Sequence, residues 1–159
     1  MERPEQNRTS GPAFMQSTLV AAIVRFTSPR DEKQLQELEL ALGAVAPASC
    51  TQAEFSLLLG ILERFPDEDG SGVFWSIVHL LEATSGYEPA LVESALRAPV
   101  EFNLLMINRL INGGTSVVAG RSLVSLLRAV ASSDAASPRA RELASKFVEY
   151  QKLHGRGGT

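Results

Sequence analysis

Three residues with chemically useful side chains, Trp75, His79 and Glu82, recur at steps of four and three in the run GVFWSIVHLLE. At that spacing they share one face of a helix. A histidine beside a carboxylate can act as a general acid and base, with an aromatic wall next to it. No nucleophile, metal ligand or oxyanion donor accompanies them, so the pattern defines no reaction class. We therefore predict a protein that is not an enzyme, in which Trp75 and His79 are structural.

Apolar residues occupy most other positions of this predicted helix, residues 72–84, so we expect it to be nearly buried. A buried polar group without a partner costs about 1–3 kcal/mol. We therefore expect His79 and Glu82 to form hydrogen bonds with neighbouring helices.

Two further polar residues, Asn108 and Arg109, interrupt the even more apolar run FNLLMINRLING. Charged groups in apolar surroundings are nearly always paired. We expect Arg109 to bond Glu82 or a carbonyl group at a helix end, and Asn108 to be structural.

The densest acidic cluster, Asp67-Glu68-Asp69, follows Pro66. The spaced oxygen ligands, central glycine and final glutamate of an EF-hand calcium loop are missing after it, which favours a solvated loop. Cys50 is the single cysteine, with neither a disulfide partner nor a nearby histidine. The sequence therefore predicts no metal and no cofactor.

Charge is distributed unevenly along the chain. Residues 31–101 contain thirteen acidic and three basic residues, a net charge of −10, although the whole chain carries only −3. Such a segment can steer a basic partner if its charges share one surface, but scattered solvated faces are an equal alternative. Widely spaced basic residues without interleaved aromatic residues argue against nucleic-acid binding. The candidate partner-binding residues, chosen because they belong to neighbouring helix ends and one loop, are Glu63, Asp67, Glu68, Asp69, Glu82 if it is exposed, and Glu88.

Apolar residues at steps of three and four, divided by prolines and capping residues, predict an all-α chain. A Thr51–Glu54 capping box and a Ser137-Pro138 start are the clearest boundaries. The expected helices are 13–26, 30–46, one between Thr51 and Pro66, 72–84, 88–98, one from Pro99 to Asn112, one following Thr115 that includes Val117, and one following Ser137.

Short helices alternating with short turns predict a compact stack of about seven or eight antiparallel helices. An irregular HEAT-like solenoid is the preferred arrangement, and an orthogonal bundle is the alternative. We expect a disordered leader at 1–12, a single domain at 13–154 and a frayed tail at 155–159. The aliphatic stretches are shorter than the roughly 20 residues of a membrane span, and the start matches a secretory signal poorly. These features predict a cytoplasmic protein, as a monomer or weak dimer.

The run FWSIVHLLE, a following Tyr-Glu-Pro and the proline-led FNLLMINRLING resemble the helical immunity proteins of bacterial polymorphic toxin systems. The resemblance covers about residues 72–114 and continues more weakly through SLVSLLRAV and FVEYQ. It is carried by Trp75, His79, Glu82, Asn108 and Arg109. The N-terminal third matches no family that we can name.

The resemblance implies a protein that neutralises a cognate toxin domain by stoichiometric occlusion, without chemistry of its own. The acidic middle segment fits a toxin with a basic active-site surface. Two other functions stay open from the residues alone. One is a helical adaptor or regulatory subunit, and the other is an enzyme centred on His79 and Glu82.

Overall fold

Eight α-helices account for most of residues 12–156, the part of the chain that the computed structural model describes, with side chains from Thr18 onward. The predicted all-α stack of seven or eight helices is confirmed. The helices are α1 (Pro12–Arg25), α2 (Glu32–Ala44), α3 (Gln52–Arg64), α4 (Val73–Glu82), α5 (Glu88–Arg97), α6 (Glu101–Asn112), α7 (Leu123–Ala131) and α8 (Pro138–Leu153). Single 3₁₀ turns cover Pro47–Ser49 and Gly70–Gly72, and two short strands, β1 (Val117–Val118) and β2 (Arg121–Ser122), lie between α6 and α7.

Local capping explains where several helices begin. Thr51 and Glu54 exchange both hydrogen bonds of the predicted capping box at the start of α3. The Ser137 side chain accepts a backbone hydrogen bond at the start of α8, as predicted. The sequence Thr27-Ser28-Pro29 also predicts a cap at Thr27 or Ser28 for the helix expected at 30–46, and this prediction is wrong. Asp31 caps this helix instead, because its carboxylate accepts from two backbone N–H groups of the first turn, at 3.0 and 3.1 Å.

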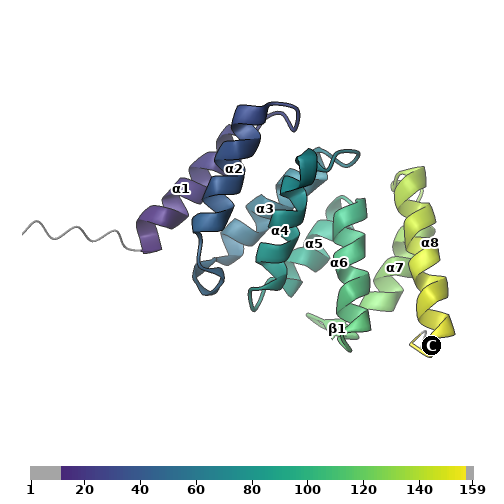
Figure 1. The fold of residues 1–159 in the computed structure, drawn as a ribbon. Coiled ribbons are helices and arrows are strands. Elements are labelled where there is room, and N and C mark those ends of the chain that lie inside the picture. The colour runs from purple at the N-terminus through teal and green to yellow at the C-terminus, as the bar shows by residue number, and fades with distance from the viewer. Residues whose placement is uncertain (1–11, 157–159) are drawn as a thin grey trace, which may run out of the picture.

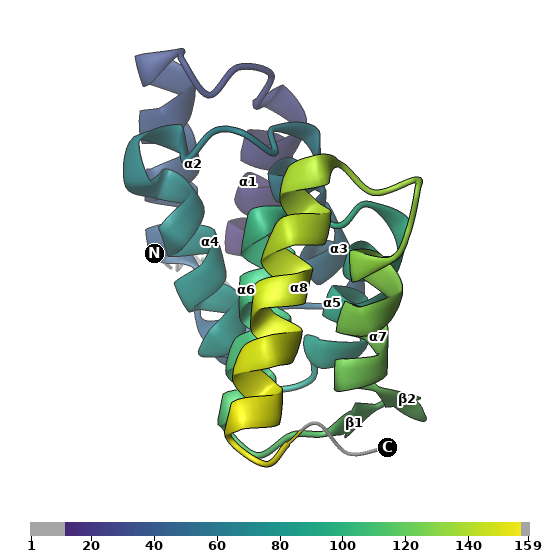
Figure 2. The ribbon, with the colours of Figure 1, turned by 90° about the vertical axis from the view of Figure 1, so that its right-hand side faces the viewer.

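Successive helices pair as antiparallel hairpins in two layers. The odd-numbered helices form one layer and the even-numbered helices the other, as the two perpendicular views show (Figures 1 and 2). This arrangement matches the predicted solenoid-like stack rather than the orthogonal bundle. The four connections from an odd to an even helix, residues 26–31, 65–72, 98–100 and 132–137, lie together at the upper end of Figure 1. We call this end the loop end.

Five aromatic side chains run beneath the loop end in a connected series, which we call the aromatic chain. Phe26 and Phe65 meet edge to face at 5.6 Å, and Phe74 lies 6.1 Å from Phe26. Phe102 continues the series at 6.2 Å from Phe74 and 5.2 Å from Trp75. Edge-to-face pairs add about 0.5–1.5 kcal/mol each to the gain from burial. The aromatic chain thus joins the residues that directly follow α1 and α3 to the helices α4 and α6.

The segment after Thr115 is not the predicted start of a helix. Val117 and Val118 pair with β2 in a hairpin whose turn residues, Ala119 and Gly120, both have positive φ, 49° and 75°. Two-residue hairpin turns favour this left-handed conformation because it matches the twist of the strands. The helix α7 begins later, at Leu123.

At the two ends of the chain, most of the predicted leader and tail lies outside the described residues. Pro12 begins α1, so this helix starts one residue before the expected position. Arg156, within the predicted frayed tail, donates a hydrogen bond to Asn112 at 3.0 Å.

Candidate functional site

A groove opens at the loop end between α4, α6 and α8. We call it the acidic groove. Its volume is about 490 Å³, and it is lined by Pro66, Asp67, Glu68, Asp69, Trp75, Glu101, Phe102 and Arg139. Four of these residues are acidic and one is basic, so the lining carries an excess of negative charge. The groove contains three of the six predicted partner-binding residues.

The connection between α3 and α4 presents the acidic side of the groove through an unusual backbone. Gly70, Ser71 and Gly72 all have left-handed φ angles, 58°, 52° and 92°. The Asp69 carboxylate accepts from the Ser71 N–H at 2.9 Å and holds this turn. A Cβ atom on Gly70 would lie 2.7 Å from two atoms of the Phe74 ring. The turn therefore needs glycine at position 70 both for its φ angle and for its close approach to the aromatic chain.

Trp75 contributes an aromatic side chain to the groove. It is 37% exposed, although Phe102 covers one of its edges. The His79 ring is also exposed, and its centroid lies 6.1 Å from that of Trp75. The prediction that α4 is nearly buried is thus wrong for the face that carries these two residues. The buried residues of α4, such as Phe74, Ile77 and Leu81, occupy the rest of its surface.

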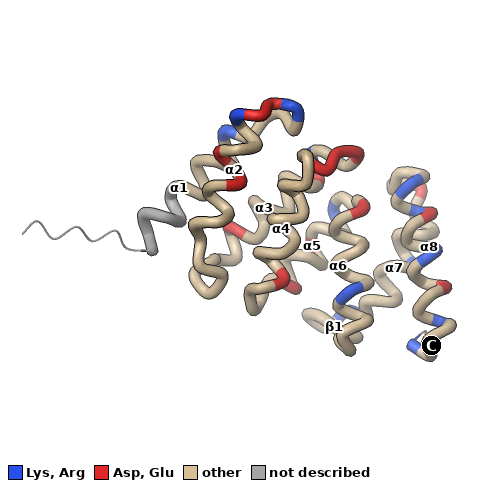
Figure 3. Tube along the Cα trace, in the orientation of Figure 1, with Lys and Arg blue, Asp and Glu red and all other residues tan. Residues whose placement is uncertain are grey.

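Ion pairs neutralise part of the acidic charge in the groove. The Arg139 guanidinium donates from Nη2 to Glu101, and its Nη1 lies 3.6 Å from Asp67 Oδ1. Arg30 donates to Glu68 Oε1 from Nε and Nη2, at 3.1 and 3.0 Å. These pairs are exposed, so each contributes about 0–1 kcal/mol to stability. Figure 3 shows the acidic residues of this connection gathered at the loop end.

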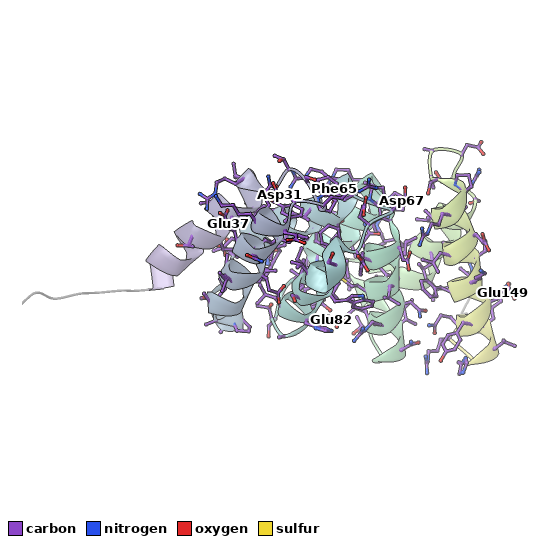
Figure 4. The ribbon with its side chains drawn as sticks, turned by 45° about the horizontal axis from the view of Figure 1, so that its top comes forward. Asp31, Glu37, Phe65, Asp67, Glu82 and Glu149 are labelled. Atoms are coloured by element: carbon purple, nitrogen blue, oxygen red, sulfur yellow. The ribbon has the colours of Figure 1, made fainter. Side chains whose placement is uncertain are left out.

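The remaining predicted partner-binding residues lie elsewhere. Glu63 is bound by Arg97 at 2.7 Å and by the Ser94 hydroxyl group at 2.7 Å, between α3 and α5. Glu82 and Glu88 lie at the opposite end of the stack from the groove, where α4 ends and α5 begins. Figure 4, which brings the loop end forward, labels Asp67 there and Glu82 away from it. The six residues therefore do not form one patch.

The predicted pairing of Arg109 is confirmed. Its Nε lies 3.0 Å from Glu82 Oε1, and this contact joins α6 to α4. The expected apolar surroundings are wrong, however, because the Arg109 side chain is 46% exposed. Glu82 is thus paired with Arg109, and neither Glu82 nor His79 lines the acidic groove. The acidic groove therefore provides no substrate pocket for an acid–base pair of His79 and Glu82.

Gln151 is an important polar residue that the sequence pattern did not single out. It is fully buried and donates from Nε2 to Asn108 Oδ1 at 2.7 Å and to Asn112 Oδ1 at 2.8 Å. The hydrogen bonds give Asn108 a structural role between α6 and α8. A usable signal existed, because Gln151 follows Ala144 and Val148 on the buried face of α8.

A second buried network, also unpredicted, surrounds Asn103. Its Oδ1 accepts from the Val100 N–H at 2.8 Å, and its Nδ2 donates to Ser94 Oγ at 3.1 Å and to the Ala98 carbonyl group at 2.9 Å. Ser94 in turn donates to Glu63. Glu63 is therefore part of the connection between α3, α5 and α6, rather than a partner-facing residue.

Two side chains have pKa values that burial raises. The pKa of Tyr87 rises to about 12, first because of burial and then because of the nearby carboxylates of Glu82 and Glu88. The pKa of the half-buried Cys50 thiol is also raised, by burial and by Glu54. A higher thiol pKa lowers the thiolate fraction, so Cys50 has the character of an unreactive thiol.

The described residues contain no group of three or more histidine, cysteine, aspartate or glutamate side chains that could hold a metal ion. Within the same range, no helix combines the length and the apolar character needed to cross a membrane. The acidic groove is thus the arrangement with the clearest chemistry, since carboxylates around a partly exposed indole suit a cationic group.

No protein-family model, curated protein sequence or solved structure matches this chain.

Proposed function

We propose that this protein binds another protein through the acidic groove, and that the partner presents a basic surface. The observation that carries this proposal is the combination of four carboxylates with a partly exposed tryptophan in one groove. Tryptophan is enriched among the residues that dominate binding energy at interfaces. Carboxylates around it add charge complementarity to a basic partner, which raises the association rate.

The proposed partner is a toxin domain, and the protein is its immunity protein. This step is supported by the resemblance of residues 72–114, which include Trp75, to helical immunity proteins. A toxin that acts on nucleic acid needs a basic surface for phosphate groups, and a carboxylate-lined groove is able to cover such a surface. Inhibition then requires tight binding and slow release, and no chemistry by this chain.

The test is to express the chain with the product of the adjacent gene, inactivated for safety. We expect a 1:1 complex in size-exclusion chromatography, and protection of cells from the active form of that product. Absence of both the complex and the protection would contradict the immunity role.

Charge substitutions test the groove itself. Asp67→Asn combined with Glu68→Gln should slow association about tenfold at low salt and flatten its salt dependence, because steering weakens. Asp69 is left in place because it holds the turn. Glu93→Gln combined with Glu149→Gln is the matched control, since it removes two exposed charges outside the groove. Equal association rates for the two variants would exclude the acidic groove as the binding site.

A helical adaptor is the second candidate function, and one observation favours it. A separate groove of about 380 Å³ lies between α1 and α3, lined by residues that include Val24 and Leu57. Val24 is 67% exposed, so this side offers apolar surface at a second location. An adaptor would hold two different proteins at once, which analytical ultracentrifugation of the purified mixture would show as a ternary complex.

A further inference from the structure

The guanidinium of Arg139 already occupies part of the acidic groove. It donates from Nη2 to Glu101, while its Nη1 lies 3.6 Å from Asp67 Oδ1. Asp67 belongs to the connection between α3 and α4, whereas Glu101 is the first residue of α6. Two carboxylates from separate elements therefore reach the same guanidinium. The groove has the shape and charge to hold this group.

Arg139 leaves much of the groove unused. Its contact with Asp67 is too long for a hydrogen bond, and the Asp67 side chain is still 79% exposed. Trp75 also keeps part of its indole surface exposed in the same groove. The volume of about 490 Å³ lies in the range of ligand sites. Acceptor oxygens and aromatic surface thus stay open to a second cation.

We propose that the acidic groove binds an arginine side chain of the partner, and that Arg139 takes the place of this side chain in the free protein. The proposal rests on the proposed function, because it names the chemistry by which the partner is recognised. Arginine suits the groove better than lysine. Its planar guanidinium can bond two carboxylates at once and stack on an indole, whereas an ammonium group is a compact point charge.

A second groove offers the Arg139 side chain an alternative position when the partner binds. This groove, of about 240 Å³, is lined by Glu101, Arg139, Glu142, Leu143 and Lys146. Arg139 and Glu101 line both grooves. Glu142 lies three residues after Arg139 on α8, a spacing at which helical side chains meet. Lys146 already lies 2.8 Å from Glu142 Oε1, so an Arg139 side chain that turns from Asp67 towards Glu142 would share this carboxylate with Lys146.

The test uses the fluorescence of Trp75, which is the single tryptophan of the chain. The probe is the peptide acetyl-Arg-Arg-Arg-amide, titrated at low ionic strength beside acetyl-Lys-Lys-Lys-amide. We expect the arginine peptide to bind about fivefold more tightly, because its planar guanidinium can form paired hydrogen bonds with carboxylates and also stack on the indole. Anisotropy of fluorescein-labelled peptides provides a second readout that does not depend on tryptophan.

Substitutions then separate competition from general charge effects. Arg139→Gln should tighten binding of the arginine peptide about threefold, which is the size expected from removing a competing exposed ion pair. The matched control is Arg141→Gln, which removes the same charge from the same helix but pairs with Asp134 outside the groove. Asp67→Asn with Glu101→Gln should weaken binding about tenfold, because both acceptors of the guanidinium lose their charge. Circular dichroism verifies that each variant is folded.

Two results would overturn the inference. One is an Arg139→Gln variant that binds no more tightly than the Arg141→Gln variant, and the other is equal affinity for the arginine and lysine peptides. If either occurs while the groove charges still control binding of the partner protein, the proposed function stands and the role of Arg139 fails. If the peptides behave as expected but the association rate of the partner protein does not depend on the groove charges, the proposed function fails instead.

Discussion

Replacing Gly70 by alanine should destabilise the protein more than the same replacement at Gly72. Both residues have positive φ, 58° and 92°, a conformation that costs a residue with a Cβ atom about 1–2 kcal/mol. At position 70 the new Cβ would also lie 2.7 Å from two carbon atoms of Phe74, whereas no atom lies within 4 Å at position 72. Such overpacking adds about 1–3 kcal/mol. The expected losses are therefore about 2–5 kcal/mol for Gly70→Ala and about 1–2 kcal/mol for Gly72→Ala.

A third glycine-to-alanine variant should change the free energy of unfolding in the opposite direction. Gly60 lies inside α3, and no atom lies within 4 Å of the place that a Cβ atom would take there. Gly60→Ala should therefore stabilise the protein by about 0.5–1 kcal/mol. Urea unfolding followed by far-UV circular dichroism measures all three, provided that the m value stays constant. A Gly70→Ala loss no larger than that of Gly72→Ala would refute the conclusion that the turn packs against Phe74. The packing of Gly70 against Phe74, which connects the acidic loop to the aromatic chain, would then have no support.

Three further predictions concern buried groups. Gln151→Leu should lower the free energy of unfolding by about 1–3 kcal/mol, because the buried Asn108 oxygen loses its donor; a neutral effect in urea unfolding would contradict the network. The pKa of Tyr87 is raised to about 12, because the folded protein favours the neutral hydroxyl group. The contribution of this group to the free energy of unfolding is therefore fully present below pH 10 and is lost as the pH rises towards 12. Unfolding of the Tyr87→Phe variant across this range should lack that loss, and parallel curves would disprove the assignment. Cys50 should react more slowly with iodoacetamide at pH 8 in the folded protein than in urea, because its thiol is half-buried with a raised pKa; equal rates would show it to be accessible.

The features predicted correctly from sequence are those that neighbouring residues determine. The capping box at Thr51 and the serine cap at Ser137 involve residues within three positions of each other. The helix predicted at 30–46 follows from apolar residues at steps of three and four, and Leu35, Leu38 and Leu42 of α2 are indeed buried. The hairpin at Ala119-Gly120 also depends on neighbouring residues, but the sequence did not predict it. The apolar residues beside its turn fit the spacing of a helix as well as the pairing of two strands. The positive φ angles of the turn decide between them, and an alanine gives little warning of such a conformation.

The features that sequence did not predict depend on which helix covers which face. Trp75 and His79 lie in a helix apolar enough to be buried on all sides, yet both side chains are exposed, and Phe102 of α6 covers only one edge of the Trp75 ring. The hydrogen bonds of Glu63 could likewise not be predicted, because its partners Arg97 and Ser94 belong to a different helix. Arg139 completes the acidic groove from the last helix, far from Asp67 in the chain. Only the tertiary arrangement brings such residues together.

The order of packing also has a kinetic consequence. Within residues 12–156, each of the main helix contacts joins helices no more than three positions apart in chain order. Short sequence separation between contacting residues favours rapid folding, because little chain entropy is lost before the contacts form. It also lets a terminal pair detach without disrupting the opposite end. Hydrogen exchange should therefore be faster in the two terminal pairs, α1–α2 and α7–α8, than in the central pairs.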